Sequence, residues 1–427
     1  MNGEDEKQRL KPKLGLFDAT AISIGAIIGG GIFVVTGIVA GFAGPALVFS
    51  LLIAAVIALF TALSFAELSF CIPKEGSVYE FAYELVSPFA GFLTGWMWIL
   101  SNVFGGAAVS LGFAYYLTAF FPNLTVNLVA AAICMAFTLL NFLGIRQSAI
   151  LNNFLVSAKL LVLAFFAIFG LAYINPSNFT PFVSPEFGTL GILYGAFYIF
   201  FSYGGFGRVA VVAEEVKDAK RNVPKAILLS LVISTIVYML IGIVAVGLAG
   251  TSNLSRSNSP LTEAISITGN STAVWIVSLG GLLATASVLI TVILGVSRVA
   301  YAMARRRDLP RILSKLHPKY NTPYYSVWIV GIMITLLVLF ADLSRVVAIS
   351  TFALLFYYAS ANISALKLKP QNKIYPTIVP VLGATSCITL LIFTLLVSPQ
   401  SWIIGIAGLT TGVIGYFVKE KIQRDKP

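Results

Sequence analysis

The fold is decided by an interrupted apolar stretch that reads Ile22-Ser23-Ile24-Gly25-Ala26-Ile27-Ile28-Gly29-Gly30-Gly31-Ile32-Phe33. Each glycine inside a helix costs up to ~1 kcal/mol relative to alanine, so a continuous helix is disfavoured here. In hydrocarbon, an unpaired backbone N–H or C=O costs several kcal/mol, so a broken helix persists only where it lines a cavity with polar contents. The stretch therefore predicts a membrane helix broken at a binding site, although glycines also suit close helix packing.

A second interruption occurs in the apolar run 192–212, which contains Ser202-Tyr203-Gly204-Gly205-Phe206-Gly207. Two glycine-interrupted spans at corresponding places in two halves of a chain indicate the substrate site of a transporter. We therefore expect the two interruptions to meet in space.

The composition is that of a polytopic membrane protein. Of the 427 residues, 58% are hydrophobic and 11% are charged, whereas charged residues approach a quarter of a soluble domain. Apolar runs of about 20 residues predict an all-α membrane protein with about twelve spans. These predicted spans are 17–41, 44–70, 89–121, 125–144, 149–174, 188–213, 224–250, 272–303, 324–341, 345–366, 374–397 and 400–418.

The net charge of +11 follows the loops. With the N-terminus inside, most lysines and arginines fall on cytoplasmic segments, and the positive-inside rule then places both termini in the cytoplasm. The loop 250–270, which can hold a short helix around 261–267, is predicted to be external. The basic excess reflects topology, so no nucleic-acid partner is expected, and the chain is assigned to the plasma membrane as a multi-pass protein.

The inventory of reactive side chains argues against catalysis. Cys71, Cys134 and Cys387 lack metal-ligand spacing, and the single histidine, His317, sits in a basic loop. No nucleophile with a base, paired carboxylates or metal ligands occur at membrane depth, so we expect neither an enzyme nor a cofactor or metal.

Two five-helix repeats, each beginning with a broken helix, followed by two extra helices, account for twelve spans. We predict a tail at 1–14, repeat one at 15–175, repeat two at 188–370, the two extra helices at 371–418 and a cytoplasmic tail at 419–427. If the repeats are inverted, breaks in helices 1 and 6 come together near the membrane midplane.

Several motifs together resemble the amino acid/polyamine/organocation superfamily. They are the first span, Ala66-Glu67-Leu68 with Ile72-Pro73 and Gly76-Ser77, Phe200 to Gly207 running to Ala213-Glu214-Glu215, and Ser297-Arg298 through Leu309-Pro310. The resemblance implies a leucine-transporter-like fold and secondary transport of an amino acid by alternating access.

By this resemblance, backbone groups of both breaks hold the zwitterion of an amino acid. The N–H groups of Gly29, Gly30 and Gly31 would bind its carboxylate, because helix N-termini offer unpaired donors. The carbonyls of Ile27, Phe201 and Gly204 would bind its ammonium group. The ring of Phe201 would close over the substrate or pack as an ordinary core residue.

Residue 207 bears on the choice of substrate. Some relatives that carry cationic substrates have an acidic residue at this position, and Gly207 provides no such countercharge, so neutral substrates are favoured. The next residue, Arg208, would oppose a cationic substrate if it faced the cavity, or it could pair with a carboxylate between helices.

Lys159 lies well inside the fifth span, where an ammonium costs roughly 2.5 to 3.5 kcal/mol unless it has partners. In proton-coupled relatives, a lysine on this helix occupies the place where sodium-coupled relatives bind a cation. The resemblance assigns it the Gly25 region and Ser287 as partners and makes the proton the coupling ion. Snorkelling of the side chain to the interface is the alternative.

These inferences predict a proton-coupled symporter of neutral amino acids. An amino acid exchanger, a polyamine carrier and a non-transporting nutrient sensor of the same fold remain as alternatives. The expected partners are a small amino acid and the lipid bilayer, with the protein a monomer or a weak homo-oligomer.

Overall fold

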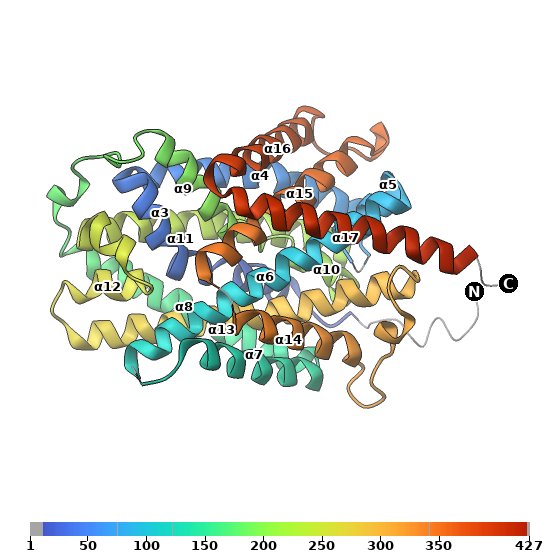
Figure 1. Ribbon diagram of the computed structural model, residues 1–427, viewed down its shortest axis with the longest axis horizontal. Coiled ribbons are helices and arrows are strands. Elements are labelled where there is room, and N and C mark those ends of the chain that lie inside the picture. The colour runs from blue at the N-terminus through green and yellow to red at the C-terminus, as the bar shows by residue number, and fades with distance from the viewer. Residues whose placement is uncertain (1–11, 75, 122, 341, 425–427) are drawn as a thin grey trace.

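The computed structural model describes residues 12–74, 76–121, 123–340 and 342–424 (Figure 1). Within these ranges every regular element is a helix, and an isolated parallel β-bridge joins Leu14 to Val216. The prediction of an all-α polytopic protein is therefore confirmed.

Each predicted span corresponds to observed helix, with boundaries that agree within a few residues. The helices are α2 (Leu16–Ile27) with η1 (Gly31–Val35) and α3 (Thr36–Ala43), α4 (Leu47–Cys71), α6 (Pro88–Phe120), α7 (Val126–Leu143), α8 (Ile145–Leu171), α9 (Leu190–Phe200) with η4 (Phe201–Tyr203) and α10 (Arg208–Val211), α11 (Ala219–Arg256), α13 (Ser271–Arg305), α14 (Tyr324–Val338), α15 (Leu343–Leu366), α16 (Ile378–Val397) and α17 (Pro399–Arg424). Ten described stretches are long and apolar enough to cross a membrane; Leu16–Cys71 contains two predicted spans, and Tyr324–Val338 is a shorter apolar helix.

Short helices connect these spans. The external-loop helix expected around 261–267 is present as α12 (Pro260–Ser266). The sequence did not predict α5 (Val78–Leu85), because eight residues are too few to read as a span. The remaining short turns of helix are η2 (Gly44–Ala46), η3 (Pro176–Phe179), η5 (Ala213–Glu215), η6 (Arg311–Ser314) and η7 (Pro370–Asn372).

Several spans begin at a side-chain cap that satisfies an otherwise unpaired N–H. The Ser87 hydroxyl accepts from the N–H of Ala90 at 3.1 Å, and Pro88 follows at the first helical position, where a missing N–H costs nothing. The Asn270 side chain accepts from the N–H of Ala273 at 3.0 Å at the start of α13. These caps explain why α6 and α13 begin where they do.

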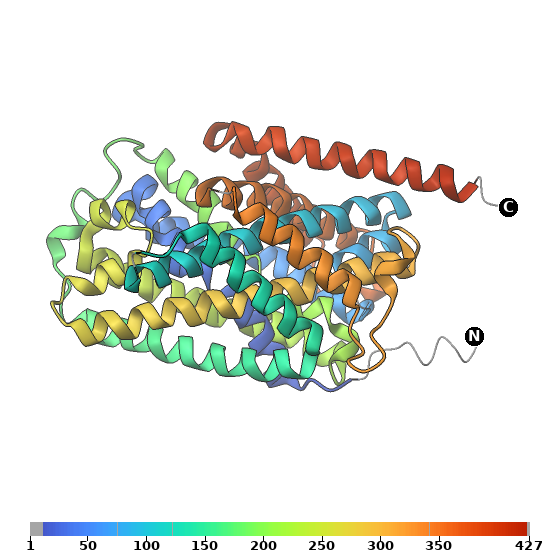
Figure 2. The ribbon, with the colours of Figure 1, turned by 60° about the horizontal axis from the view of Figure 1, so that its bottom comes forward.

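Helices α6, α13 and α15 form the buried centre, and α6 packs against both of the others. Helix α17 lies along the outside of the bundle (Figure 2). On the peripheral helix α8, Phe154, Leu161 and Ile168 are 64%, 72% and 74% exposed. Their spacing of seven residues forms one apolar stripe suited to lipid.

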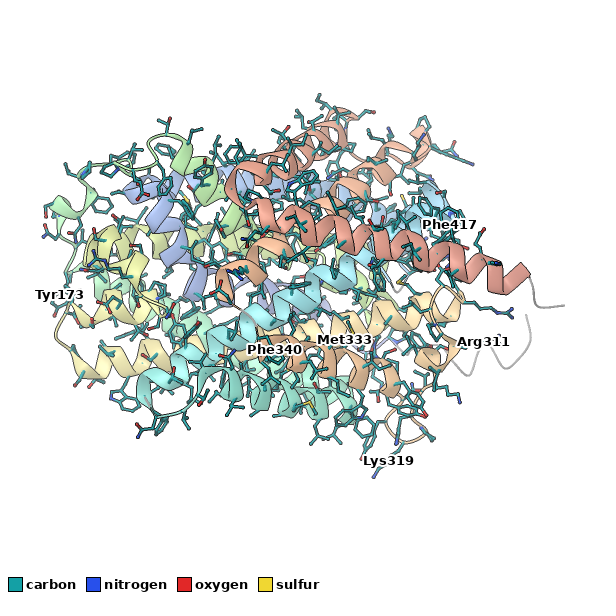
Figure 3. The ribbon with its side chains drawn as sticks, in the orientation of Figure 1. Tyr173, Arg311, Lys319, Met333, Phe340 and Phe417 are labelled. Carbon is teal, nitrogen blue, oxygen red and sulfur yellow. The ribbon has the colours of Figure 1, made fainter. Side chains whose placement is uncertain are left out.

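The described chain enters and leaves the bundle at the same end, on the right in Figure 1, as an even number of crossings requires. Arg311 and Lys319 lie toward that end, whereas Tyr173 lies at the opposite end (Figure 3). The predicted tail 1–14 lies outside the described residues as far as residue 11, as do residues 425–427 of the second tail. Helix α17 continues beyond residue 418, where the second tail was expected to begin. The division into two repeats stays a prediction.

The membrane orientation can be tested at Asn258, an exposed residue between α11 and α12. In a background lacking Cys71, Cys134 and Cys387, we expect Asn258→Cys to react with an impermeant maleimide in intact cells. Lys319→Cys, at the opposite end of the molecule, is the matched control and should react only after permeabilisation. The reverse pattern would contradict the predicted topology.

Candidate functional site

The first break separates α2 from α3. Helix α2 ends at Ile27, and Ile28 adopts an extended conformation with φ −77° and ψ 105°. Gly29 and Gly30 follow, and η1 then continues as a wide π-helical turn. The last carbonyls of α2 and the first N–H groups of η1 therefore lie beside the same gap, and helix ends leave such groups without intrahelical partners.

The second break separates α9 from α10. Helix α9 ends at Phe200, the tighter turn η4 follows, and turns over 204–207 lead into the single turn of α10. The carbonyl of Phe201 accepts the N–H of Gly204 at 3.1 Å. Residues 201–207 thus form a 3-10 turn and further turns in place of a regular α-helix.

The two breaks contact each other directly. A Cβ on Gly205 would lie 2.6 Å from the carbonyl oxygen of Ala26 and would overlap the adjacent backbone, so glycine is required there. A Cβ on Gly31 would overlap Ser202 in the same way. The hydroxyl of Ser23 donates to the carbonyl of Phe206 at 3.0 Å. These contacts bring together the two interruptions that the sequence predicted.

Tyr238 on α11 joins both breaks from one side. Its buried hydroxyl donates to the carbonyl of Ile27 at 2.6 Å and lies 3.3 Å from the carbonyl oxygen of Ser202. Because each carbonyl oxygen has two lone pairs, Ile27 and Phe201 can each accept one further hydrogen bond.

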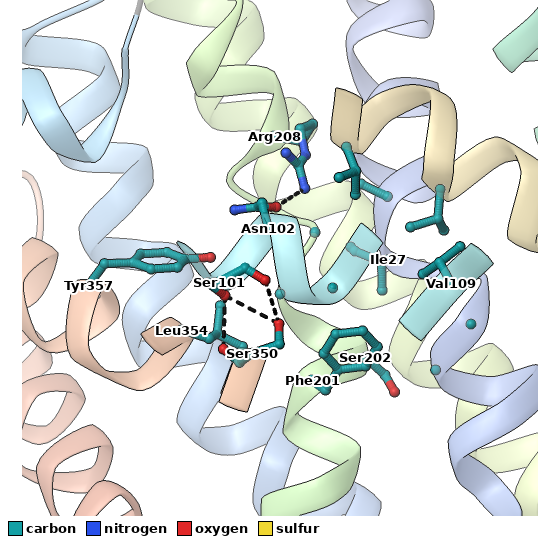
Figure 4. Close-up of a pocket in the computed structure, with 18 residues that line it drawn as sticks. Ile27, Ser101, Asn102, Val109, Phe201, Ser202, Arg208, Ser350, Leu354 and Tyr357 are labelled. Carbon is teal, nitrogen blue, oxygen red and sulfur yellow. Dashed lines mark hydrogen bonds between the residues drawn. The ribbon is translucent and has the colours of Figure 1, made fainter. Parts of the chain in front are cut away.

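A small cavity lies where the breaks meet, and the space in it that is open to the centres of water-sized molecules is about 40 Å³ (Figure 4). One wall is polar and comes from α6, α10 and α15, with the side chains of Ser101, Asn102, Arg208, Ser350 and Tyr357. The remaining lining is mostly apolar and includes Val109, Phe201, Val288, Val292 and Leu354. A ligand with one polar end and some apolar surface suits this combination.

The cavity contains most of the predicted substrate residues. Its lining includes Ile27, Gly30, Gly31, Phe201 and Gly204.

Two predicted residues lie outside the lining. A Cβ on Gly29 would overlap Val288 of α13, and a Cβ on Gly207 would lie 2.7 Å from the ring of Phe65 on α4. Gly207 therefore faces a neighbouring helix, and the adjacent Arg208 reaches the cavity instead.

Lys159 points into the bundle from the face of α8 opposite its lipid stripe, and its side chain is fully buried. The Nζ atom donates to the carbonyl of Gly25 at 3.1 Å, to the hydroxyl of Ser287 at 3.0 Å and to the carbonyl of Ile28. Lys159 thus braces the first break from behind and ties it to α13. Snorkelling is incompatible with this placement.

Asn152 lies about two turns before Lys159 on the same face of α8. It adds hydrogen bonds to the group formed by Lys159, Gly25 and Ser287. Its side-chain oxygen lies 3.2 Å from the Ser287 hydroxyl, and its Nδ2 donates to the carbonyl of Ala21 at 3.2 Å. A Cβ on Gly25 would lie 2.5 Å from the same oxygen. Neither Asn152 nor Tyr238 was predicted from the sequence. The available signals were the pair Asn152-Asn153 in the fifth span and the tyrosine hydroxyl in the apolar run 224–250.

Arg208 is 5% exposed and lines the cavity. Its Nη2 donates to Oδ1 of Asn102 at 2.5 Å, and its guanidinium carbon lies 5.0 Å from the centre of the Trp98 ring. Of the two orientations left open by the sequence, the structure shows the one toward the cavity, with an amide rather than a carboxylate as its partner.

The end of the site nearer the chain termini is closed by backbone pairing. The N–H groups of Lys13 and Leu14 donate to the carbonyl of Glu215 at 2.8 and 3.0 Å, and the Lys217 N–H donates to the carbonyl of Leu14 at 2.9 Å. The Glu215 carboxylate in turn pairs with Arg298 of α13 at 3.3 Å. The beginning of α2 and the segment after the second break are thereby held together.

The short helix α5 adds a second closure at this end. The Tyr79 hydroxyl donates to Asp308 at 2.7 Å, and Lys419 of α17 pairs with the same carboxylate at 2.6 Å. Burial, followed by the negative charge of Asp308, raises the pKa of Tyr79 above its ordinary value, so the phenol remains a donor.

Comparison with known proteins agrees with this arrangement, because the model of the amino acid permease family matches residues 14–416. The chain belongs to the amino acid permease family. A branched-chain amino acid permease of Bacillus subtilis is 35% identical over 388 residues, covering 86% of this chain and 83% of that protein. The protein is accordingly a membrane permease for amino acids and not an enzyme.

Other relatives carry different substrates by name. A methylthioribose transporter of Bacillus subtilis is 29% identical over 98% of this chain and 95% of its own length. A vacuolar cationic amino acid transporter of Arabidopsis thaliana is 31% identical over 86% of this chain and 64% of its own length. Family membership therefore gives the general activity, and the substrate must be argued from the cavity.

Two adjacent glycines of the second break provide a test of the contact between the breaks. Gly205→Ala should lower the melting temperature of the purified protein, because overpacking against backbone costs about 1 to 3 kcal/mol. Gly204→Ala is the matched control. Its Cβ would lie 3.2 Å from the flexible end of the Leu354 side chain and 3.2 Å from the carbonyl oxygen of Phe201, so the contacts are much less severe. Equal melting temperatures for both variants would contradict the close approach.

Proposed function

We propose that this permease is a secondary active transporter that couples amino acid uptake to protons by alternating access. Its substrates lack a cationic side chain, and neutral amino acids are among them. One observation supports the proposal most directly. A cavity lies between two helix breaks, and a fully buried lysine, Lys159, is hydrogen-bonded to the backbone of the first break.

The backbone of the breaks suits the two charges of an amino acid. The N–H groups at the start of η1 carry the partial positive charge of a helix N-terminus and can bind a carboxylate. The carbonyls of Ile27 and Phe201 keep lone pairs for an ammonium group, and Gly204 lies beside them in the lining. Both ends of a zwitterion can then be held without any charged side chain.

Lys159 supports proton coupling because its hydrogen bonds match one protonation state. An ammonium has three N–H donors, and Nζ has three acceptors, namely the carbonyls of Gly25 and Ile28 and the hydroxyl of Ser287. A neutral amine has only two donors, so loss of the proton leaves one acceptor without a partner. The contact between α8, the first break and α13 then weakens, which frees the first break to move.

The charge of the cavity disfavours cationic substrates. Arg208 lines it, and among the described lining residues none is aspartate or glutamate. This argues against a polyamine carrier. An exchanger or a nutrient sensor would use the same cavity, and net uptake into vesicles that contain no amino acid distinguishes a symporter from both.

We further propose a leucine-transporter-like arrangement of inverted repeats, because the first and sixth spans are the broken ones and their breaks meet. The basic loop residues support a plasma-membrane protein with cytoplasmic termini. The chain is proposed to act as a monomer or a weak homo-oligomer.

Removal of the titratable group tests the coupling. In proteoliposomes, the wild type should accumulate substrate by up to about tenfold per unit of imposed pH gradient, since one unit corresponds to ~1.4 kcal/mol per proton. Lys159→Gln keeps two N–H donors but cannot change charge, so it should bind substrate and only equilibrate it. Lys315→Gln, which changes an exposed lysine between α13 and α14, is the matched control and should accumulate like the wild type.

Two results would contradict this mechanism. Proton-driven accumulation by Lys159→Gln would show that the lysine is not the coupling group. Accumulation by the wild type that requires sodium would show that the proton is not the coupling ion.

A further inference from the structure

Arg208 has N–H donors for which the described residues provide no acceptor. Its side chain is buried, yet Nε and Nη1 have no hydrogen-bond partner among the described residues. Leaving such donors unsatisfied costs free energy, and more so for a charged group. In a transport cavity, a ligand is the natural source of the missing acceptors.

The position of the guanidinium is fixed by its surroundings. Nδ2 of Asn102 donates to the carbonyl of Trp98 at 2.8 Å, which directs Oδ1 of the same amide toward Arg208. The guanidinium lies over the Trp98 ring, and its Nη1 packs against Gly295, where a Cβ would lie 2.3 Å from Nη1 and 3.0 Å from Cδ. Of the two unpaired donors, Nε is therefore the one less confined by this packing. The side chain is therefore preorganised rather than loosely placed, which lowers the cost of binding a partner.

Within the described ranges, no carboxylate pairs with this charge. None of the described ion pairs involves Arg208, and its one hydrogen-bonded partner is the neutral Asn102. The cavity thus carries the uncompensated positive charge of Arg208, which favours an anion.

We propose that Arg208 is the specificity-determining residue of the cavity and that it binds a carboxylate at the end of the substrate's side chain. The substrate class is then an acidic amino acid, whose backbone zwitterion occupies the helix breaks while its side chain reaches the polar wall. The assignment rests on the proposed function. A hydrogen bond from a guanidinium to a carboxylate is charge-assisted on both sides and is stronger than one to the neutral oxygen of a carboxamide.

The remaining wall fits the same substrate. Ser101 and Ser350 donate to each other's carbonyls at 2.8 and 2.7 Å, so these hydroxyl protons are already used. Val109, Val288 and Val292 offer apolar contact for the methylene groups of the side chain. Neutral amino acids can enter the same space, but their side chains offer Arg208 no charged acceptor.

The test compares each acid with its amide of nearly equal size. Labelled glutamate, glutamine, aspartate and asparagine are supplied to proteoliposomes containing the full-length chain, and binding is followed in parallel by thermal shift. We expect the wild type to prefer each acid over its amide by about tenfold or more, the effect of a hydrogen bond to a charged group. In Arg208→Gln, the ratio of acid to amide should fall to about one.

Asn102→Asp is a second variant that keeps the size of the side chain. It gives Arg208 a carboxylate partner within the protein, so the substrate carboxylate is no longer needed, and the ratio should again fall. Lys315→Gln, at an exposed lysine between α13 and α14, controls for a general change in surface charge and should keep the wild-type ratio. Because a ratio is measured, reduced overall uptake in either variant does not imitate the expected result.

The outcomes separate this inference from the proposed function. If the wild type transports neutral amino acids but binds the acids no better than their amides, the role of Arg208 is wrong and amino acid symport stands. A preference for acids that persists in both Arg208→Gln and Asn102→Asp would likewise show that Arg208 does not determine specificity, and amino acid symport would stand. If no amino acid is bound or transported, both proposals fall.

Discussion

The structure depends on one constraint, which is that backbone groups released by a broken membrane helix must find partners inside the protein or in a ligand. Here the two breaks provide some of these hydrogen-bond partners for each other, since the Ser23 hydroxyl donates to the carbonyl of Phe206. Tyr238 does the same for Ile27 from α11. The backbone N–H and C=O groups that keep hydrogen-bonding capacity face one cavity, and they suit the carboxylate and the ammonium group of a zwitterion. Fold and site are thus two consequences of the same interruption.

Two buried basic side chains, Lys159 and Arg208, have different roles beside this cavity. Lys159 lies behind the first break and has all three donors engaged, so its protonation state is linked to the geometry of the backbone. Arg208 lines the cavity and has donors to spare, so it is suited to recognising what enters. The closure formed by Leu14, Glu215 and Arg298 fixes the opposite ends of the same two broken helices.

Hydropathy predicted the spans well, because length and apolar composition are properties of the local sequence. The meeting of the two breaks was also expected from the sequence, because glycine-interrupted spans at corresponding places in two halves of a chain indicate one shared site. The contact between Lys159 and Ser287 was expected only through family resemblance. The orientations of Gly207 and Arg208 could not be derived, because adjacent residues on a turn point in different directions and the packing of Phe65 and Trp98 decides between them. Asn152 and Tyr238 escaped for the same reason: one polar residue in an apolar helix does not reveal which neighbour it meets.

The central claim is that the unwound backbone of both breaks forms the substrate site. Hydrogen–deuterium exchange followed by mass spectrometry measures those backbone N–H groups directly. Peptides covering 25–35 and 200–208 should exchange more slowly, and together, when a transported amino acid is added to the purified protein. Unchanged exchange in both peptides at a saturating substrate concentration, with protection elsewhere in the chain, would contradict the account.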